Sequence, residues 1–303
     1  MKKEKTTRKG RKKRISLSTI ILSAIFLVGL GIILYPTVSD YWNSFHQTRA
    51  IDNYNALVEE LDDTDYEALF AAAEEYNEQL RRLGAPFSEY EQLEELYYSV
   101  LDVAGTGIIG YINIPKISVN LPIYHGTGDA VLNVAVGHLE GSSLPIGGEA
   151  RHSVLSAHRG LPSAKLFTDL DQLDVADIFT ITVLNQVLTY EIDQVLIVEP
   201  TQLEALNVSP GKDYCTLLTC TPYGINTHRM LVRGHRIENI DDRVIVVSPD
   251  AQKVPTYYVI PAVGVPLLFI ALFIMLVASG RHEAKKTGEE MLEEFKNKGD
   301  YNG

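Results

Sequence analysis

Cysteine is scarce in this sequence. Among its 303 residues only Cys215 and Cys220 carry a thiol, and both lie in the stretch YCTLLTC (214–220). Two cysteines are too few for the dense disulfide framework of a small secreted domain. Glycine-rich nucleotide loops and Cys/His clusters at zinc-binding spacing are also missing, so we expect no cofactor. The pair is therefore a disulfide, a metal clip, two buried small residues, or the location of a reactive nucleophile.

Charge is absent from two long apolar runs, residues 15–35 and residues 257–279. Each run exceeds the roughly 18 to 20 residues that a helix needs to cross a hydrocarbon core of about 30 Å. We therefore expect two transmembrane helices. The alternative for the first run is a cleaved signal peptide, but the run is longer than an h-region of about 7 to 15 residues and no clear cleavage site follows it. The alternative for the second run is a buried core helix.

The charges that flank these runs predict an orientation. Residues 1–14 are rich in Lys and Arg, and basic residues also begin the tail 280–303. Because cytoplasmic flanks carry an excess of Lys and Arg, we expect both tails in the cytoplasm and residues of about 40–255 outside the cell membrane. The net charge is −12 despite the basic start, so the outer part is acidic. An acidic domain is a poor binder of nucleic acid.

Residues 40–103 have the composition and spacing of helices. Apolar side chains recur at helical spacing over 64–84, with a capping box predicted at Thr64 and a C-cap glycine at Gly84. A Gly-Ala-Pro break follows, and a helix is predicted to resume over 88–103. This zone is either a helical extension with a function of its own or a simple helical stalk.

Residues 104–248 have the composition of strands. They contain short runs of β-branched and aromatic residues that are separated by Gly, Pro and Asn. One helix is expected among the strands, over residues 130–141. The pattern favours a mixed β-barrel or sandwich. The predicted strands cover residues 107–115, 119–126, 152–158, 177–200, 214–220, 229–237 and 243–248.

The spacing of the cysteines argues against a disulfide. Side chains along a strand alternate between its faces, and positions 215 and 220 differ by an odd number. At about 3.3 Å per residue their Cα atoms lie roughly 16 Å apart, beyond the limit of about 7 Å for a bridge. Cys215, among ordinary strand residues, is expected to be a small buried residue. Cys220 ends the strand directly before TPYG, where a side chain can face a cleft.

A reactive thiol needs a basic or cationic neighbour. His158 and Arg229 both lie at the boundaries of predicted strands. A histidine can take the proton of a thiol and return it to a leaving amine, and an arginine presents a fixed fork of donors to a developing oxyanion. Composition alone does not select among the histidines. The others are His46, His125, His138, His152, His228, His235 and His282.

These residues lie in motifs that resemble those of the sortases, the membrane-anchored cysteine transpeptidases of Gram-positive bacteria. TLLTC ends in Cys220, SAHRG contains His158 and THRMLVRG contains Arg229, in that family's order along residues 104–240. The resemblance implies Cys220 as the nucleophile, His158 as the general acid/base, and Arg229 as the group that orients the substrate and stabilises the oxyanion. Thr219, directly before the nucleophile, is a candidate to support the acyl oxygen, with a plain strand role as the alternative.

The resemblance also implies a fold. We expect a mainly β chain with an eight-stranded sortase-like barrel, short helices, an N-terminal helical extension and two terminal transmembrane helices. The helical extension, the second apolar run and TPYGINTHRMLVRG are similar to the class C sortases, which polymerise pilins. That class implies cleavage of an LPxTG-like sorting signal after its threonine, a thioacyl-enzyme intermediate, and transfer to a lysine amine of another pilin subunit.

Class C enzymes often carry a lid over the cleft, with an Asp-Pro-aromatic motif. The matching residues here are Ala85, Pro86 and Phe87, so the aromatic is present but the acidic residue that would pair with the active-site arginine is missing. We therefore expect a looser lid, because an ion pair to a desolvated guanidinium adds to the stability of the closed form. The alternative is an ordinary loop between helices.

Three other functions fit part of the pattern. A housekeeping sortase, which attaches proteins to a cell-wall precursor, usually lacks the helical extension and the second span. A plain cysteine protease transfers the acyl group to water. A non-catalytic membrane scaffold would use the acidic domain for binding and would not depend on Cys220. The sequence favours the pilus-assembling transpeptidase, with pilin subunits, an acceptor lysine and the membrane as partners.

Overall fold

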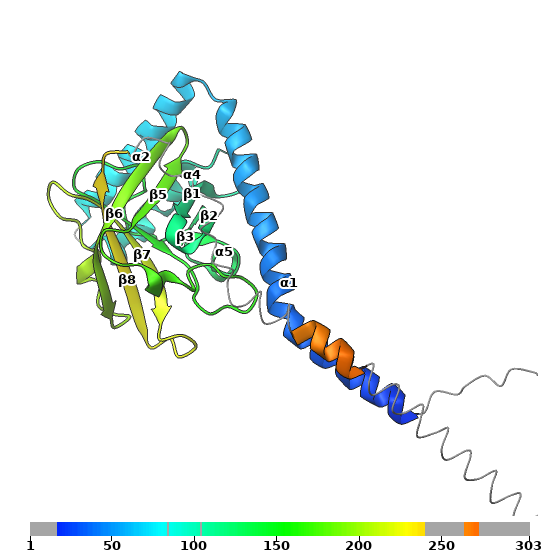
Figure 1. Cartoon of the computed structure of the whole chain (residues 1–303). Helices are drawn as coiled ribbons and strands as arrows, with labels where there is room; N and C mark the ends of the chain where they lie inside the picture. The colour runs from blue at the N-terminus through cyan, green and yellow to red at the C-terminus, as the bar shows by residue number, and fades with distance from the viewer. Residues whose placement is uncertain (1–16, 84, 104, 240–263, 273–303) are drawn as a thin grey trace, which may run out of the picture. The chain divides into compact units, whose positions relative to one another are not determined.

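Two compact units make up the chain, one formed by residues 38–252 and the other by residues 1–37 together with residues 253–303. The computed structural model describes residues 17–83, 85–103, 105–239 and 264–272. Figure 1 shows the elements by colour along the chain.

Eight β-strands of the unit 38–252 form a closed barrel. They are β1 (Ile108–Ile114), β2 (Val119–His125), β3 (Val136–His138), β4 (Arg151–Ser156), β5 (Ile178–Val183), β6 (Gln186–Val198), β7 (Asp213–Thr221) and β8 (His228–Ile237). Their order around the barrel is β1-β2-β3-β4-β7-β8-β6-β5. The β2–β3 and β4–β7 pairs are parallel and the others are antiparallel. The predicted eight-stranded mixed barrel is confirmed.

Two features of the strands differ from the prediction: β3 was not predicted, and the single run predicted over 177–200 is two strands, β5 and β6, separated by a turn at Leu184 and Asn185. The helix expected over 130–141 is limited to α5 (Asp129–Leu132), and β3 follows it with its three residues buried. Gly137 allows this pairing, because a Cβ there would lie 2.3 Å from the carbonyl oxygen of Gly126. Pairing with β2 therefore overrides the helical pattern. The strand predicted over 243–248 lies outside the described residues.

The helices of this unit precede the barrel. They are the second half of α1 (Leu17–Glu59), then α2 (Asp63–Arg82), α3 (Pro86–Glu89) and α4 (Glu94–Ser99). The prediction of one continuous helix over 88–103 is wrong, because a 3₁₀ turn at Tyr90–Leu93 separates α3 from α4.

The predicted start of α2 is also wrong. Asp62 is the N-cap, and its carboxylate accepts from the amide of Asp65 at 3.0 Å while Asp65 accepts from the amide of Asp62 at 3.1 Å. Asp caps a helix as well as Thr does and here precedes Thr64. The C-cap is Leu83, and the predicted capping residue Gly84 lies outside the described residues.

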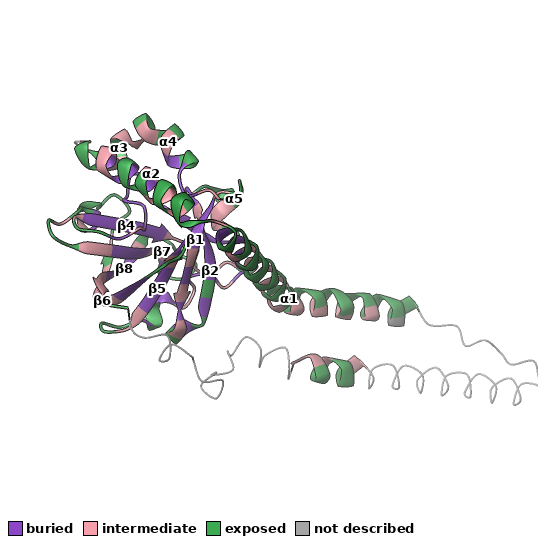
Figure 2. Ribbon diagram, turned by 90° about the horizontal axis from the view of Figure 1, so that it is seen from above, coloured by how far each residue is buried: buried purple, intermediate pink, exposed green. Residues whose placement is uncertain are grey.

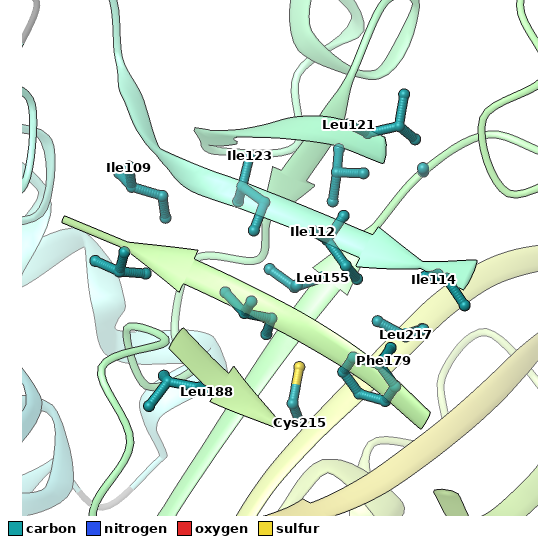
Figure 3. Packing of buried hydrophobic residues seen from close by; sticks show 14 of the residues in the cluster. Ile109, Ile112, Ile114, Leu121, Ile123, Leu155, Phe179, Leu188, Cys215 and Leu217 are labelled. Atoms are coloured by element: carbon teal, nitrogen blue, oxygen red, sulfur yellow. The ribbon is translucent and has the colours of Figure 1, made fainter. Parts of the chain in front are cut away.

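A single hydrophobic cluster fills the barrel and continues under the helices. Figure 3 shows Ile112, Phe179 and Leu217 pointing into it. Residues of α1, α2 and α4 belong to the same cluster, so the helical zone completes the core instead of standing apart from it. In Figure 2 much of each barrel strand accordingly has the purple colour of buried residues. The Tyr54 hydroxyl joins α1 to the barrel by donating to the Ile109 carbonyl at 3.2 Å and accepting from the Leu184 amide at 2.8 Å.

One helix among the described residues, Ile20–Glu59, is long and apolar enough to cross a membrane, with a mean hydropathy of 2.3 over its best 18 residues. In the unit formed by the chain ends, residues 264–272 of the second apolar run are helical. There the Phe26 and Phe269 rings meet edge to face, with centroids 6.2 Å apart. The rest of 257–279, and the tails 1–14 and 280–303, lie outside the described residues, so two spanning helices remain a prediction.

Candidate active site

The predicted catalytic residues lie where three neighbouring strands end. β7 pairs with β8 in a register that sets Cys220 opposite Arg229. β4 runs parallel to β7, and the amide of Ala157 continues that ladder by donating to the carbonyl of Leu218 at 3.2 Å. His158 therefore follows β4 at the level of Cys220. The fold brings to one edge three residues that are distant in sequence.

The three side chains belong to the outer face of the barrel wall. Cys215 is fully buried inside, so Cys220, an odd number of positions further along the strand, is on the other face. Ala157 packs in the same core, which directs its neighbour His158 outward. Arg229 shares the face of Cys220 because directly opposed residues of a ladder lie on the same side. Cys220, His158 and Arg229 are each half-buried.

The two thiols are free and occupy different environments, which confirms that they do not form a disulfide. Cys215 lies among Phe179, Leu188 and Leu217 in Figure 3, and burial raises the pKa of its thiol well above the ordinary value. The thiolate is the nucleophilic form, so this buried thiol is unreactive. Cys220, half-buried at the end of its strand, is the more accessible of the two thiols.

Burial distinguishes His158 from the histidines of the interior. His125, His138 and His152 are buried, and desolvation lowers the pKa of each, to about 3 for His138. A ring held neutral in this way is a poor partner for a thiolate. His138 instead has a structural contact, its Nδ1 lying 2.9 Å from the Tyr97 hydroxyl. Among the described residues no group of three or more His, Cys, Asp or Glu side chains is placed to hold a metal ion.

The Arg229 guanidinium forms no ion pair with a carboxylate of the described residues. Its Nη1 donates to the carbonyl oxygens of Asn226 at 3.3 Å and His228 at 3.2 Å, both in its own turn. Guanidinium carries further N–H donors in a planar fork. These donors suit a carbonyl or oxyanion held between Arg229 and Cys220.

Thr219 has a structural contact next to the site. Its side chain is on the inner face, and its hydroxyl donates to the carbonyl oxygen of Ala157 at 2.8 Å. The bond fastens the segment that leads into His158 to the residue before Cys220. In this structure the hydroxyl holds the two segments in register and does not face the acyl-binding side.

A second link comes from Arg159, which had no role in the sequence-based interpretation. Its Nη1 donates to Oγ1 of Thr221 at 3.3 Å and its Nη2 pairs with the carboxylate of Asp171, while the side chain is only 10% exposed. The residue after His158 thus holds the residue after Cys220. The adjacency of Arg159 to His158 was visible in SAHRG, but the position of Asp171 depends on the fold.

The loops that follow β4 and β7 also pack on each other. Gly160 has a φ of +77°, and a Cβ at this position would lie 2.8 Å from the ring of Tyr223. Only glycine accepts both the left-handed backbone and the close ring. The contact supports the turns that hold His158 and Arg229.

Of the three predicted lid residues, Phe87 contacts the outer face of the barrel. Ala85 is the exposed N-cap of α3 and Pro86 is its first residue. Phe87 is half-buried and packs against a cluster on the outside of the barrel that includes Leu218 of β7 and Leu231 of β8. Leu218, which packs against the same cluster, is two positions before Cys220 and on its face.

The predicted lid segment follows α2, which is bound to the barrel. The buried guanidinium of Arg151 pairs with Glu74 and, at 2.9 Å, with Glu78. Hydrogen bonds from Arg81 and from Arg151 lower the pKa of Glu78 to about 2. Asn77 adds a buried bond by accepting from the amide of Leu144 at 2.7 Å. These bonds fix the end of α2 from which the lid segment starts.

Comparisons with known proteins agree on one family. A family model described as the sortase domain matches residues 112–237. The chain is 33% identical over 117 residues to Sortase A of Streptococcus agalactiae serotype III, a match that covers 38% of this chain and 47% of that relative. The match thus spans only about half the length of the curated relative.

Two solved structures are covered over their whole length. The crystal structure of sortase C1 from Streptococcus agalactiae is 52% identical, with a TM-score of 0.61, and the match covers 63% of this chain and 100% of the other. The structure of Clostridium perfringens sortase C with the C-terminal cell wall sorting motif is 40% identical, with a TM-score of 0.54 and coverages of 63% and 100%.

Proposed function

The chain belongs to the sortase family, and from this premise we propose that it is a membrane-anchored cysteine transpeptidase of the class C type, which joins pilin subunits. The observation that carries the proposal is the strand register, which sets Cys220 opposite Arg229 with His158 at the same level. The 52% identity to a sortase C1 over the whole of that chain supports the class.

In the first half-reaction the Cys220 sulfur attacks the carbonyl carbon of the threonine in an LPxTG-like sorting signal. His158 takes the thiol proton and passes it to the leaving amine as the C–N bond breaks. The products are a thioester on Cys220 and the released C-terminal fragment with a free amine. Arg229 donates to the oxyanion of the tetrahedral intermediate, where charge develops only during the reaction.

In the second half-reaction the amine of an acceptor lysine on another pilin subunit attacks the thioester carbonyl. His158 takes a proton from this amine and returns it to sulfur as the C–S bond breaks. An isopeptide bond forms and the free thiol is restored, so the cycle needs no oxidant and no nucleotide. Arg229 stabilises the second oxyanion in the same position.

The proposed organisation places the catalytic domain outside the membrane and both chain ends in the cytoplasm. The apolar helix of the described residues supports the first span, and the helical residues 264–272 are consistent with a second. The proposed parts are the tail 1–14, the span 15–35, the helical extension with its lid loop 40–103, the barrel 104–248, the span 257–279 and the tail 280–303.

The test is intact-mass spectrometry of the purified chain with an LPxTG-type peptide and a lysine-bearing pilin. We expect an acyl adduct on Cys220 and a lysine-linked product. Both disappear in Cys220→Ala and persist in the matched control Cys215→Ala, whose thiol is enclosed in the core.

Other outcomes separate the alternatives. Release of free acid with the pilin present indicates a cysteine protease. Transfer only to a cell-wall precursor indicates a housekeeping sortase. A lack of any adduct, with function retained in Cys220→Ala, indicates a non-catalytic scaffold.

A further inference from the structure

The turns of α1 that begin the unit 38–252 carry an uncovered apolar stripe. Val38, Tyr41, Trp42 and Phe45 recur at i, i+3, i+4 and i+7, which places them on one side of a helix. Their exposed fractions are 61%, 69%, 64% and 56%. We call these four residues the aromatic stripe. An apolar set at this spacing normally packs on a protein core, but no described residue buries this one.

The opposite side of the same turns is bound to the barrel. Asp40, Asn43 and Gln47 each make a side-chain hydrogen bond to the backbone of a barrel loop. At about 100° per residue these three positions centre roughly 180° from the aromatic stripe. Their partners are the Lys165 amide at 2.7 Å, the Ser163 carbonyl at 2.8 Å and the Val134 carbonyl at 2.6 Å.

The composition of the stripe and its place in the chain indicate what covers it. The stripe directly follows the most apolar part of the helix. Trp and Tyr are the residues that gather at membrane–water interfaces. Arg49, exposed and seven positions after Trp42, continues the same side with a positive charge, which suits anionic lipid headgroups. The rise from Val38 to Phe45 is about 10 Å, comparable to a headgroup layer of roughly 5 to 8 Å crossed by a tilted helix.

We propose that the aromatic stripe is a docking surface for the headgroup region of the bilayer in which the chain is anchored. The proposal rests on the membrane anchoring of the proposed function and adds a contact between the catalytic unit and lipid. Its consequence for the active site follows from the bonds on the other side of the helix. Lys165 is held by Asp40, and two residues later the amide of Phe167 donates to the carbonyl of His158 at 3.1 Å. The loop that begins at His158 is thereby held beside the membrane surface.

Trp42 makes the proposal measurable, because it is the only tryptophan of the chain. The full chain is reconstituted into vesicles of phosphatidylcholine and phosphatidylglycerol whose acyl chains carry bromine near the headgroup or deeper. We expect strong quenching of Trp42 emission by the shallow bromines, weaker quenching by the deep ones, and protection from acrylamide in the water phase.

A chain that floats with the vesicles but whose Trp42 is open to acrylamide and unaffected by bromine overturns the docking surface while leaving the anchoring intact. Failure to float contradicts the anchoring itself. A third outcome is that Trp42 is protected from acrylamide but not quenched by bromine, and that this protection disappears on dilution into excess lipid. It would mean that a second copy covers the stripe, which also overturns the proposal.

A variant checks the stripe without removing the probe. Tyr41→Ser combined with Phe45→Ser is expected to at least double the acrylamide quenching constant of Trp42 and to reduce bromine quenching. The matched control is Ile197→Ser, which changes a barrel residue that is 61% exposed and should leave the Trp42 signal unchanged. All three substituted side chains are exposed, so circular dichroism should show the same fold. An unchanged quenching profile in the double variant contradicts the proposal.

Discussion

Arg159, the neighbour of the proposed acid/base His158, donates to Thr221, the neighbour of the proposed nucleophile Cys220, while Asp171 holds the guanidinium. We predict that Arg159→Met lowers kcat by roughly one to two orders of magnitude, since a displacement of about 1 Å in a reacting group can cost 10²-fold. KM should change less, because the substitution acts on the placement of His158 and Cys220.

The measurement is kcat and KM of acyl transfer for Arg159→Met and for Arg159→Lys. Lys keeps a cation for Asp171, so it should restore part of the rate. A loss of rate that merely follows the loss of folded protein, with kcat per folded molecule unchanged in both variants, would show that Arg159 only stabilises the fold.

At the residue scale, the sequence predicted the features that follow from the alternation of side chains along a strand. It missed a feature for which two residues are equally good candidates. The odd spacing of Cys215 and Cys220 was enough to place them on opposite faces, since strand alternation leaves no other choice. The N-cap of α2 was misplaced because Asp62 and Thr64 are both good caps and sequence alone does not rank them. The bond of Thr219 to Ala157 joins residues 62 positions apart and has no local signal.

Among the elements, α2 has the clearest electrostatic attachment. The ordinary pKa of Glu78 near 4.5 is lowered to about 2 by the hydrogen bonds from Arg81 and Arg151. A carboxylate whose pKa is depressed in the folded state stabilises it above pH 4.5, and this contribution is lost as the pH falls toward 2. We predict that Glu78→Gln is less stable than the parent at pH 6 and that the difference narrows as the pH approaches 2.

Urea midpoints of both proteins at pH 6, 4, 3 and 2 measure this difference. Glu67→Gln is the control, since Glu67 is exposed on the same helix and has no ion pair with a described residue. A difference in urea midpoint between Glu78→Gln and the parent that stays constant over the whole pH range would show that the variant is destabilised for reasons other than the lost charge.

The lid segment offers a second prediction at this scale. Ala85→Asp supplies the carboxylate that the motif lacks, and Arg229 has no other carboxylate partner among the described residues. An exposed ion pair contributes up to about 1 kcal/mol, so the closed lid should gain up to about fivefold in population and the initial rate of acylation should fall accordingly.

Ala85→Asn separates this effect from helix capping. Position 85 is the N-cap of α3, and Asn caps as well as Asp but carries no charge. Equal stopped-flow acylation rates for the two variants would contradict pairing between the lid and Arg229.

The prediction of elements succeeded where long-range pairing agreed with the local pattern. Strands β1, β2 and β5 to β8 are rich in β-branched residues and bounded by turn residues, so their local signal was strong. β3 is only three residues long and follows a helical turn, and its pairing with β2 decides its conformation. The helix expected over 88–103 breaks because Leu93, Leu96 and Tyr97 must reach the core from a bent segment.

For the whole molecule the proposed topology predicts that both chain ends are on the same side of the membrane. Green fluorescent protein fused after Gly303 should fluoresce, because it folds in the cytoplasm, whereas a fusion after Asn239 should be dark. Alkaline phosphatase fused at the same two positions should give the reverse pattern. Fluorescence from both fusions would exclude an outer catalytic domain.

Local sequence patterns could not predict how the residues of the site come together. Periodicity placed His158, Cys220 and Arg229 at strand ends, but the parallel pairing of β4 with β7 joins strands that are separated by two others in the chain. The resemblance of the motifs supplied the expectation that the three residues meet. The bonds of Asp40, Asn43 and Gln47 to the barrel, on which the docking surface depends, had no counterpart in either the motifs or the periodicity.

The position of β7 between β4 and β8 has a consequence for faulty copies of this protein. A shift of β7 by one residue against both neighbours would turn the Cys220 sulfur into the core and present a threonine hydroxyl in its place. The same shift would turn Cys215 outward, but about five residues along the strand from the level of His158 and Arg229, so such a copy would lack a thiol beside the groups that the proposed chemistry requires. This folding error would therefore inactivate the protein and would not create an acyltransferase of altered selectivity.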